Sequence, residues 1–455
     1  MTKPYGFKTM KKQMTILGGG ESGVGAALLA KQKGYDVFVS DQGSLKEMYR
    51  RELQDSAIEF EENGNSEERI LQADEIMKSP GIPESNPLVK KIREKGIKVI
   101  SEIELAYRFM GDSKLIAITG SNGKTTTTAL IHHVCKIAGL DCALVGNIGY
   151  SFAKQVAIEP KEIYVVEVSS FQLDDIHEFR PYIAVLTNIT EDHLDRYNYN
   201  FENYINSKFR IVMNQKPGDH FIYCADDEVT MKYINQFIIS SNPLPISMKK
   251  EVTQGAFIKD GDVYVRTGHE QISMSVYDFA LKGKHNQYNS MAACVAGSTM
   301  EIRKEKIREA VQTFQSLEHR MEHVAVVRGV EFVNDSKATN VNSTWYALES
   351  MEKPIILIMG GVDKGNDYSL ILELVKEKVK AIICLGIENR KIHEAFGNHV
   401  STIVNTDNAI DAVQSAFHLS EKGDVVLLSP ACASFDLYKN YEDRGSQYKQ
   451  AVREL

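Results

Sequence analysis

The sequence predicts an α/β protein of three domains, each a Rossmann-like or P-loop-type, mainly parallel sheet flanked by helices. The first observation is a recurring unit, in which a short apolar run leads into a glycine-rich turn and then a helical pattern. The second is the length of 455 residues, which suggests roughly three domains. The runs that carry the pattern are MTILGGG, KLIAITGSNGK, IYVVEVSS, IAVLTNIT, IILIMGGVDKG, AIICLGIE and VVLLSPACAS.

Two loose boundaries divide these runs. One falls near Gly111-Asp112-Ser113, and the other falls near Leu317-Glu318, after the helical AVQTFQSL pattern. We therefore expect domains at residues 1–111, 112–316 and 317–455. Ligands of such sheets bind beyond the carboxyl ends of the strands, so the loops at those ends are the candidate sites.

The composition is that of a soluble globular chain, with 43% hydrophobic and 25% charged residues. A net charge of −8 argues against a nucleic-acid partner. No apolar stretch approaches the ~20 residues that span a bilayer, and the N-terminus lacks a secretory leader pattern. The six cysteines form no CxxC pair and favour buried free thiols. We expect a cytoplasmic monomer without a membrane partner.

The stretch GSNGKTT follows the apolar run Leu115–Ile118 and opens a helical pattern, TTALIHHVCKIAG. Phosphate binding favours this layout, with free backbone N–H groups at a helix N-terminus, a lysine and a hydroxyl for Mg²⁺. The stretch departs from G-x-x-x-x-G-K-[ST], because Ile118 stands where the first glycine belongs. A plain strand–turn–helix corner is the alternative. We expect an ATP site in which Lys124 reaches the β/γ-phosphates, formed by Gly120, Ser121, Asn122, Gly123, Lys124, Thr125 and Thr126.

A second glycine turn, Gly18 to Gly23, follows MTIL, and the next strand, YDVFVSD, ends at Asp41. This is G-x-G-x-x-G with an acidic residue about 20 positions on, a dinucleotide fingerprint of weak to moderate specificity. Two nucleotide sites on one chain suggest ATP and a nucleotide-linked substrate. A loop at Ser79-Pro80-Gly81 could close over the second ligand, or be a simple proline turn.

Two other classes of protein explain part of the pattern. An NAD-dependent oxidoreductase would use GGGESG and Asp41 but leave GSNGKTT and Glu167 unused. A P-loop switch or binding protein would use GSNGKTT but not NDSKATN or SPACASFD.

Polar side chains stand at or after the ends of the central strands. Glu167 lies in the apolar run EIYVVEVSS, where a carboxylate is costly to bury unless it is paired or holds a cation. His193 follows YIAVLTNI, Asn147 ends LVGN, and Lys208 lies in a helical pattern. Alone, these would be a salt-bridged glutamate, a loop histidine, a turn asparagine and a solvated lysine.

Together, nine stretches in chain order resemble the motifs of the Mur ligases, which add amino acids to a UDP-linked peptidoglycan precursor. They are GSNGKTT, VGNIG, EVSSFQL, TNITEDHLDRY, GKHNQYN, EHRME, NDSKATN, GGVDKG and SPACASFDLYKNYEDRG. The last resembles the D-glutamate-adding members. The resemblance covers essentially the whole chain.

The resemblance implies ATP-dependent addition of D-glutamate to UDP-N-acetylmuramoyl-L-alanine. Phosphorylation of the L-alanyl carboxylate would give an acyl phosphate, because oxide cannot leave. Attack by the D-glutamate amine would follow through a tetrahedral intermediate, with catalysis mostly by positioning and charge neutralisation. The reaction belongs to peptidoglycan precursor synthesis.

The resemblance also assigns residues. Thr125 and Glu167, with Lys124, would hold the triphosphate and one Mg²⁺, and His193 would serve a second Mg²⁺. Lys208 would react with CO₂ to form a carbamate, which turns a cation into an oxygen ligand. The resemblance further implies three groups of ligand-binding residues. For ATP they are Asn286, Asn289, Arg320 and Asp335; for D-glutamate, Thr339, Lys364, Ser434 and Tyr441; and for the UDP-substrate, Gly20, Ser22, Gly23, Asp41, Ser79, Pro80, Gly81 and Asn147.

Lys337 would face the reacting centre as a catalytic residue, beside Lys124, His193 and Lys208. Asn286 and Asn289, three apart, would share a helix face toward adenine, although a polar helix surface is the alternative without the family. The third domain would close before reaction and exclude water from the acyl phosphate.

One departure concerns the first domain, where Gln42 and Gly43 replace the threonine–arginine pair common in the family. The alternative within the family is a Mur-type ligase of different amino-acid specificity. The diaminopimelate-adding members carry a DNPR-type motif, which this sequence lacks, and folylpolyglutamate synthetases lack a UDP-binding first domain.

Overall fold

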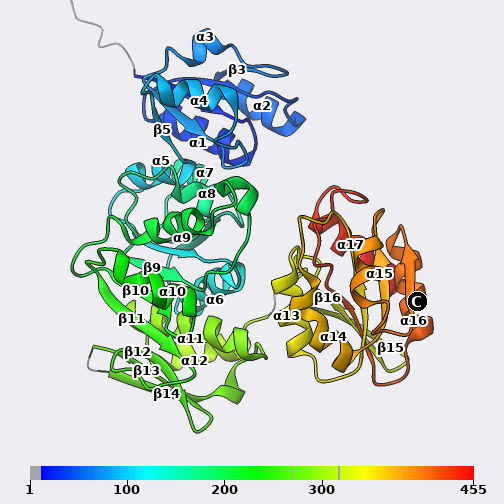
Figure 1. The fold of residues 1–455 in the computed structure, drawn as a ribbon. Helices are drawn as coiled ribbons and strands as arrows, with labels where there is room; N and C mark the ends of the chain where they lie inside the picture. The colour runs from blue at the N-terminus through cyan, green and yellow to red at the C-terminus, as the bar shows by residue number, and fades with distance from the viewer. Residues whose placement is uncertain (1–11, 269, 316–317) are drawn as a thin grey trace, which may run out of the picture. The chain divides into compact units, whose positions relative to one another are not determined.

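The computed structural model describes residues 12–268, 270–315 and 318–455, in which three sheets carry helices on their faces (Figure 1). The chain divides into two compact units. The first comprises the chain up to residue 279 with residues 288–313, and the second comprises residues 280–287 and 314–455.

The first sheet has five parallel strands in the order β3-β2-β1-β4-β5. Its central strand β1 buries every residue after Gln13, as expected for a strand covered on both faces. The strands are β1 Gln13–Leu17, β2 Asp36–Ser40, β3 Glu59–Glu61, β4 Glu75–Lys78 and β5 Lys98–Ile100. The helices are α1 Glu21–Gln32, α2 Glu47–Asp55, α3 Glu67–Ile70, α4 Pro87–Glu94 and α5 Glu102–Phe109.

The second sheet has nine strands in the order β14-β13-β12-β11-β10-β9-β6-β8-β7. The pairings from β7 to β12 are all parallel, and only β13 pairs antiparallel with its two neighbours, β12 and β14. The strands are β6 Lys114–Thr119, β7 Cys142–Gly146, β8 Ile163–Glu167, β9 Ile183–Leu186, β10 His220–Cys224, β11 Asn242–Ser247, β12 Gly255–Lys259, β13 Asp262–Thr267 and β14 Glu270–Ser275. The helices are α6 Lys124–Ile137, α7 Phe152–Ile158, α8 Ser170–Leu173, α9 Phe201–Phe209, α10 Glu228–Tyr233, α11 Lys284–Thr299 and α12 Lys304–Thr313.

The first two sheets share one hydrophobic core, which runs from Met14 through α1, α5 and α7 to Ile234. Helix α1 packs closely on α7. At that contact a Cβ on Gly25 would lie 2.1 Å from Ser151 Oγ, so only glycine allows this approach. The first and second sheets are therefore held together as one body within the first unit.

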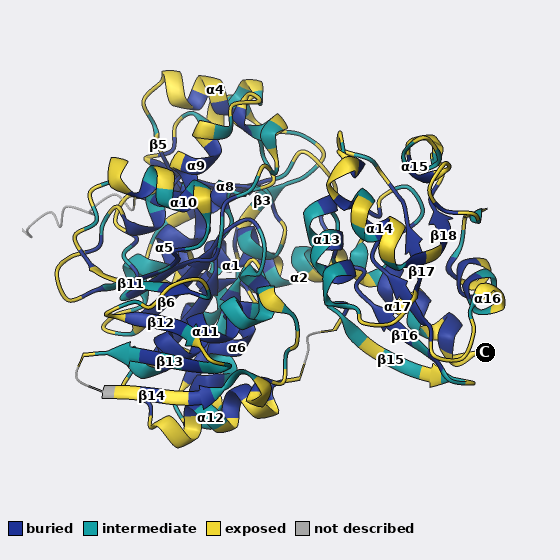
Figure 2. Ribbon diagram, turned by 60° about the horizontal axis from the view of Figure 1, so that its bottom comes forward, coloured by how far each residue is buried: buried dark blue, intermediate teal, exposed yellow. Residues whose placement is uncertain are grey.

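The third sheet has six strands in the order β15-β16-β20-β17-β18-β19, and only β15 is antiparallel to its neighbour. Strands such as β17 and β18 are buried and helices α15 and α16 present exposed faces (Figure 2). The strands are β15 Glu322–Val327, β16 Val330–Asn334, β17 Ile355–Met359, β18 Val379–Leu385, β19 Ile403–Thr406 and β20 Val425–Leu428. The helices are α13 Val341–Ser350, α14 Leu372–Lys378, α15 Arg390–Phe396, α16 Ala409–Leu419 and α17 Tyr441–Arg453.

These sheets confirm the predicted fold class. The domain boundaries at 111/112 and 316/317 stay predictions, and residues 316 and 317 lie outside the described residues. All six cysteines are buried and free, as expected. Within the described part of the chain, no helix has the length and apolar character that a membrane crossing requires.

Candidate active site

The turn between β6 and α6 is fixed by the loop that follows β9. The N–H of Ser121 donates to Asn188 O at 2.8 Å, and that of Asn122 to Asn188 Oδ1 at 2.9 Å. Thr187 Oγ1 donates to Asn122 O at 2.6 Å. A Cβ on Gly120, whose φ is 144°, would lie 1.9 Å from Thr187 Oγ1, so this position requires glycine. The turn is preorganised by these bonds.

Lys124 is the first residue of the 14-residue helix α6. Its Nζ donates to Gly120 O at 2.7 Å and to Ser121 O at 2.8 Å, so the ammonium lies over the turn. The N-terminus of a helix attracts anions through its backbone N–H groups and its dipole. Thr125, next in the helix, is buried. This arrangement can hold a phosphate between the lysine and the turn.

Glu167 ends β8 and is buried. Its Oε1 accepts a hydrogen bond from Asn147 Nδ2 at 2.8 Å, and Asn147 N–H donates to Glu167 O at 2.9 Å. Strands β7 and β8 are parallel neighbours, which brings the two residues to one edge of the sheet. Asn147 therefore orients the carboxylate, and its contact with the UDP-substrate stays a prediction.

His193 begins the short 3-10 segment Leu194–Tyr197 with a left-handed φ of 52°. Its ring meets the Phe171 ring edge-on at 5.2 Å between centroids, and its Nε2 lies 3.6 Å from Asp192 Oδ2. The side chain is 42% exposed, so a ligand can reach it. The structure thus places His193 beyond β9, next to the strand that ends in the P-loop turn.

Lys208 is buried in α9, although a helical lysine would by itself be expected in solvent. Its Nζ lies 4.7 Å from the centre of the Tyr204 ring and donates to Thr119 Oγ1 at 3.5 Å. Burial lowers the pKa of Lys208 well below its ordinary value, and the charge of Lys124 lowers it further, against nearby carboxylates. The environment favours a neutral, nucleophilic amine.

Asp41 joins the first glycine turn to the loop that follows β2. Its Oδ2 accepts from Gly19 N–H at 2.6 Å and its Oδ1 from Gly43 N–H at 2.8 Å. The carboxylate shapes the loop from both sides, and a direct contact with the UDP-substrate stays a prediction. Gly43 and Gln42, where the family pattern is broken, are exposed.

The glycine turn lies against the loop after β4. A Cβ on Gly18, whose φ is 94°, would lie 2.7 Å from Ser79 Oγ, and Ser79 N–H donates to Leu17 O at 2.9 Å. By contrast, nothing lies within 4 Å of a Cβ placed on Gly20, which precedes α1. The predicted residues Gly20, Ser22, Gly23, Ser79, Pro80 and Gly81 follow the carboxyl ends of β1 and β4, which are parallel neighbours.

In the second unit, Asp335 follows β16 and is buried. Its Oδ2 accepts from Ser429 Oγ at 3.0 Å and its Oδ1 from Met321 N–H at 3.2 Å. Burial raises the pKa of Asp335 to about 7, although the positive charge of Arg320 opposes the shift. The carboxylate is tied to β20 and to the segment that carries Arg320.

Three of the residues predicted for D-glutamate lie on loops after the adjacent parallel strands β16, β20 and β17, and the fourth, Tyr441, is the first residue of α17. Val362 N–H donates to Ala433 O at 2.8 Å, which pairs the loop of Lys364 with that of Ser434. Lys337 Nζ lies 5.1 Å from the centre of the Tyr441 ring. Thr339 N–H donates to Lys337 O at 2.9 Å. Ser434 is buried, whereas Lys364 is exposed.

Arg444 was not predicted from the sequence, although it belongs to the YEDRG run. It is buried in α17, and Nε donates to Ser336 Oγ at 3.0 Å. Nη2 donates to Ser336 O at 2.9 Å and to Cys432 O at 3.2 Å, and Nη1 to Gly360 O at 3.4 Å. One guanidinium therefore holds all three strand-end loops. The position of Arg444 in the sequence does not indicate that it contacts these three loops.

The predicted adenine residues both lie on α11, three positions apart, as predicted. Asn289 is buried and its Oδ1 accepts from Thr127 Oγ1 at 3.1 Å, directly under Gly123. Asn286 lies in the part of α11 that belongs to the second unit, and its Nδ2 donates to Lys282 O at 2.8 Å. Asn289 thus packs under the P-loop turn, and adenine contacts stay predictions.

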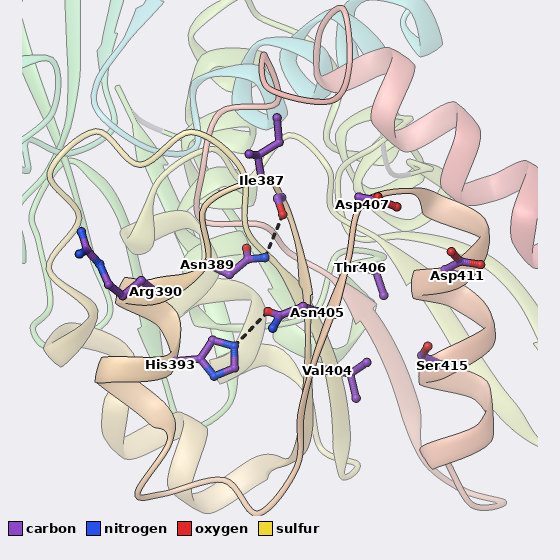
Figure 3. A pocket seen from close by; sticks show the side chains of 11 residues that line it. Ile387, Asn389, Arg390, His393, Val404, Asn405, Thr406, Asp407, Asp411 and Ser415 are labelled. Carbon is purple, nitrogen blue, oxygen red and sulfur yellow. Dashed lines mark hydrogen bonds between the residues drawn. The ribbon is translucent and has the colours of Figure 1, made fainter.

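A hollow of about 700 Å³ opens at the carboxyl ends of β18 and β19 (Figure 3). Asp411 and Ser415 of α16 line one side, and His393 of α15, which is hydrogen-bonded to Asn405 Oδ1 at 3.0 Å, lines the other. None of the residues predicted from the sequence lines it. The residues that the sequence predicts for D-glutamate lie instead beyond the ends of β16, β20 and β17 of the same sheet.

Comparisons with known proteins identify the family of the chain. Family models match residues 12–101 as a Mur ligase MurD-like N-terminal domain, 118–297 as a Mur ligase middle domain, and 319–432 as a Mur ligase glutamate ligase domain. The chain belongs to the Mur ligase family, as its motifs predict.

Within that family, full-length relatives carry the name UDP-N-acetylmuramoylalanine--D-glutamate ligase. The protein of Christiangramia forsetii is 53% identical over 98% of this chain and all of its own length. That of Bacteroides fragilis is 52% identical over 98% and 100% of the two chains, and that of Salinibacter ruber is 41% identical over 98% of each.

Solved Mur ligases share the fold at low sequence identity. UDP-N-acetylmuramate-alanine ligase from Thermotoga maritima is 16% identical with a TM-score of 0.61, covering 97% of this chain and 99% of its own. The MurF ligase of Thermotoga maritima in complex with ADP is 14% identical with a TM-score of 0.59, covering 92% and 95%.

Proposed function

We propose that the chain catalyses ATP-dependent addition of D-glutamate to UDP-N-acetylmuramoyl-L-alanine, in cytoplasmic peptidoglycan precursor synthesis. The observation that carries the proposal is the match, over nearly the whole chain, to relatives with this activity in their name. The preformed P-loop turn with Lys124 over it supports the ATP half of the reaction.

The chemistry follows from the groups in place. Lys124 and the backbone N–H groups of α6 would position the triphosphate, so that the γ-phosphoryl passes to the L-alanyl carboxylate and gives an acyl phosphate. The D-glutamate amine then attacks the acyl carbon, and phosphate leaves from a tetrahedral intermediate. Lys337, on the loop after β16, would face the reacting carboxyl oxygen and stabilise its negative charge.

Two Mg²⁺ sites fit the donor set. Thr125 offers a hydroxyl at the start of α6, which follows β6, and Glu167 offers a carboxylate at the end of the neighbouring strand β8; hard oxygen ligands suit Mg²⁺. Among the described residues no three His, Cys, Asp or Glu side chains gather as a metal cluster. The remaining oxygens would come from the nucleotide, Lys208 as a carbamate, and solvent, with His193 serving the second ion. Bound Mg²⁺ would neutralise charge on the phosphates.

The carbamate rests on the state of the Lys208 amine. Only the neutral form attacks CO₂, and burial with the neighbouring Lys124 charge favours that form. The product carries two oxygens in place of an ammonium, so the buried position gains a metal ligand. The carboxylate Glu167 would then have a second anionic oxygen group beside it.

The C-terminal loops support the amino-acid half. D-glutamate carries two carboxylates and needs cationic and hydrogen-bonding partners. Lys364, Thr339, Ser434 and Tyr441 would supply them from loops that Arg444 and the Val362–Ala433 pairing hold in place. The UDP group would lie at the glycine turn before α1. Arg320 and Asp335 would serve ATP, and the protein would be a monomer.

Phosphate release tests the proposal. The protein is incubated with ATP, Mg²⁺ and UDP-N-acetylmuramoyl-L-alanine, with D-glutamate, L-glutamate or lysine added separately. We expect release with D-glutamate alone, at one phosphate per amide formed. Release with another amino acid would support the alternative, a Mur-type ligase of different specificity. Release that ignores both substrates would overturn the ligase proposal.

A further inference from the structure

Arg196 joins two loops that come from different sheets. It lies three residues after His193, in the 3-10 segment beyond β9. Its Nη2 donates to Pro80 O at 2.9 Å and its Nη1 to Gly81 O at 3.5 Å, in the loop after β4. One guanidinium thus connects the loop predicted to contact the UDP-substrate with the loop that carries His193.

The same guanidinium is held flat by an aromatic ring. It lies 4.3 Å from the centre of the Phe171 ring. That ring also meets His193 edge-on at 5.2 Å and stacks with Tyr197 at 5.8 Å between centroids. A planar guanidinium can stack and donate two hydrogen bonds at once, which an ammonium cannot do. Arg196 and His193 therefore share one support.

The backbone of this segment needs external support. His193, Asn198 and Tyr199 have φ values of 52°, 56° and 53°, in the left-handed region that residues other than glycine rarely adopt. Such conformations persist where surrounding contacts hold them, and they concentrate at functional segments. Arg196 N–H donates to His193 O at 3.0 Å, so a movement of Arg196 is transmitted to the histidine backbone.

A second link between the same regions runs through Asp175, just after α8. Arg93 donates to its Oδ1, and Lys78 Nζ lies 3.2 Å from its Oδ2. Asp175 is almost fully buried, so the segment from Phe171 to Asp175 is fixed to the first sheet. The hydrogen bonds of Arg196 to Pro80 O and Gly81 O then connect the 79–81 loop with the more exposed turn that carries His193.

We propose that Arg196 is a positioning residue that couples occupancy of the UDP-substrate loop, residues 79–81, to the placement of His193. The inference rests on the proposed function, because it assigns the 79–81 loop to the UDP-substrate. A substrate that orders the Pro80 and Gly81 carbonyls fixes Arg196, and Arg196 fixes the turn that bears His193. Binding at the two sites is therefore cooperative, and by linkage the effect is reciprocal.

The test measures that cooperativity by binding. The affinity for the β,γ-imido analogue of ATP with Mg²⁺ is determined by calorimetry, with and without saturating UDP-N-acetylmuramoyl-L-alanine. In the natural protein we expect the substrate to tighten analogue binding about tenfold, within the usual range of coupling. In Arg196→Gln we expect this factor to fall close to one, while affinity for the analogue alone changes less than about twofold. Arg196→Lys should give an intermediate factor.

A matched control exists in the same unit. Arg266 also stacks on a phenylalanine, 4.6 Å from the centre of the Phe257 ring, and donates to a backbone carbonyl, Val252 O, at 3.2 Å. It lies on β13, away from both loops. Arg266→Gln should lose comparable stability and keep the full coupling factor, which separates positioning from a merely structural role.

Three outcomes overturn the inference. The first is a coupling factor near one in the natural protein, and the second is a full factor in Arg196→Gln. The third is equal loss of coupling in Arg266→Gln. Phosphate release by the natural protein, measured in parallel, distinguishes the causes. If release depends on both substrates, a failed coupling test rejects the role of Arg196 alone; if it does not, the proposed function fails as well.

Discussion

Lys208 of the central domain and Lys364 of the C-terminal domain lie in opposite environments. Lys208 is buried under the strand that leads to the P-loop, and its pKa is lowered by that burial. Lys364 is exposed on the loop after β17. Both are assigned to the same reaction, yet their surroundings suit them to different tasks.

The difference follows from what each task needs. A lysine that must react as a neutral amine needs an environment that disfavours its charge, and burial provides one. A lysine that binds a carboxylate needs its charge, and solvent exposure keeps it. The polar groups around the central site are accordingly fixed by internal hydrogen bonds, such as those between Thr187 and Asn122. In the C-terminal domain, the buried residues Arg444 and Asp335 hold the loops after the strands through their hydrogen bonds.

The largest effect is expected at Lys208. Replacing it with methionine keeps the shape but removes the amine, so phosphate release should fall by at least ~100-fold through loss of the charged ligand. Folding stability should not fall with it, and should rise by about 1 kcal/mol, because a buried polar group is replaced by an apolar one. Activity and chemical denaturation, measured on the same preparation, check both parts.

The pH dependence of the same pair of proteins sharpens this prediction. In metal-free, CO₂-free buffer the unfolded chain binds one more proton at Lys208 than the folded chain, because the folded pKa is lowered. The stability of the natural protein relative to Lys208→Met should therefore rise with pH, by up to ~1.4 kcal/mol per unit, and level off near the ordinary lysine pKa of about 10.5. Lys232→Met is the control, because Lys232 Nζ also lies near an aromatic ring, 5.2 Å from the centre of Tyr233, but the residue is exposed. Its substitution should not change how stability depends on pH. A pH-independent difference would contradict the burial argument.

A smaller effect is expected at Asp335, a buried carboxyl in the C-terminal domain. Its folded pKa of about 7 lies above the ordinary value, so the folded chain holds the extra proton between about pH 4 and 7. Stability contributed at low pH is lost as pH rises through 7. Asp335→Asn should remove this loss, so that its stability relative to the natural protein rises by up to ~1.4 kcal/mol per pH unit between about pH 4 and 7 and levels off above pH 7. Phosphate release should fall about 10-fold.

Denaturation curves between pH 5 and 8 test the Asp335 prediction. Asp407→Asn, a change at an exposed aspartate of the same domain, serves as the control. If the natural protein and Asp335→Asn show the same slope with pH, then Asp335 is ionised throughout and its role must be sought in its hydrogen bonds.

Sequence reasoning was strongest where the signal is local. The P-loop turn, its lysine and the strand before it are contiguous, and the apolar runs that predict strands match β1, β6, β8, β9, β17, β18 and β20. Glu167 was predicted because a carboxylate in an apolar run stands out. The edge strands β12 to β14, by contrast, are joined by short turns such as Asp260-Gly261 rather than by helices, so the strand–turn–helix pattern did not reveal them.

Residues whose role depends on distant contacts were missed. Arg196 and Pro80 are 116 positions apart, and Arg444 and Ser336 are 108 apart. Both arginines lie in motif stretches, TNITEDHLDRY and SPACASFDLYKNYEDRG, but the stretches do not tell which distant loops the side chains contact. Lys208 was found only through the family resemblance, because its burial is produced by how Tyr204, Ile205 and Phe209 pack α9 onto the sheet. Asp41 shows the reverse case, in which a motif residue also shapes the backbone.

The smallest effect on kcat is expected at Lys364, whose charge is screened by solvent. Lys364→Gln should raise the KM for D-glutamate about tenfold, because one charge-assisted contact to a carboxylate is lost. The kcat and the KM for ATP should change little, since the proposed phosphate site at the start of α6 lies in the central domain. Lys391→Gln is the matched control: Lys391 lies beside the same loop, 2.7 Å from Asp363 Oδ1, but is not assigned to the substrate. If both variants raise the KM for D-glutamate equally, the rise comes from a change in the loop, and Lys364 does not contact D-glutamate directly. If Lys364→Gln instead lowers kcat as strongly as Lys208→Met, then the contrast between a buried reactive lysine and an exposed binding lysine is wrong.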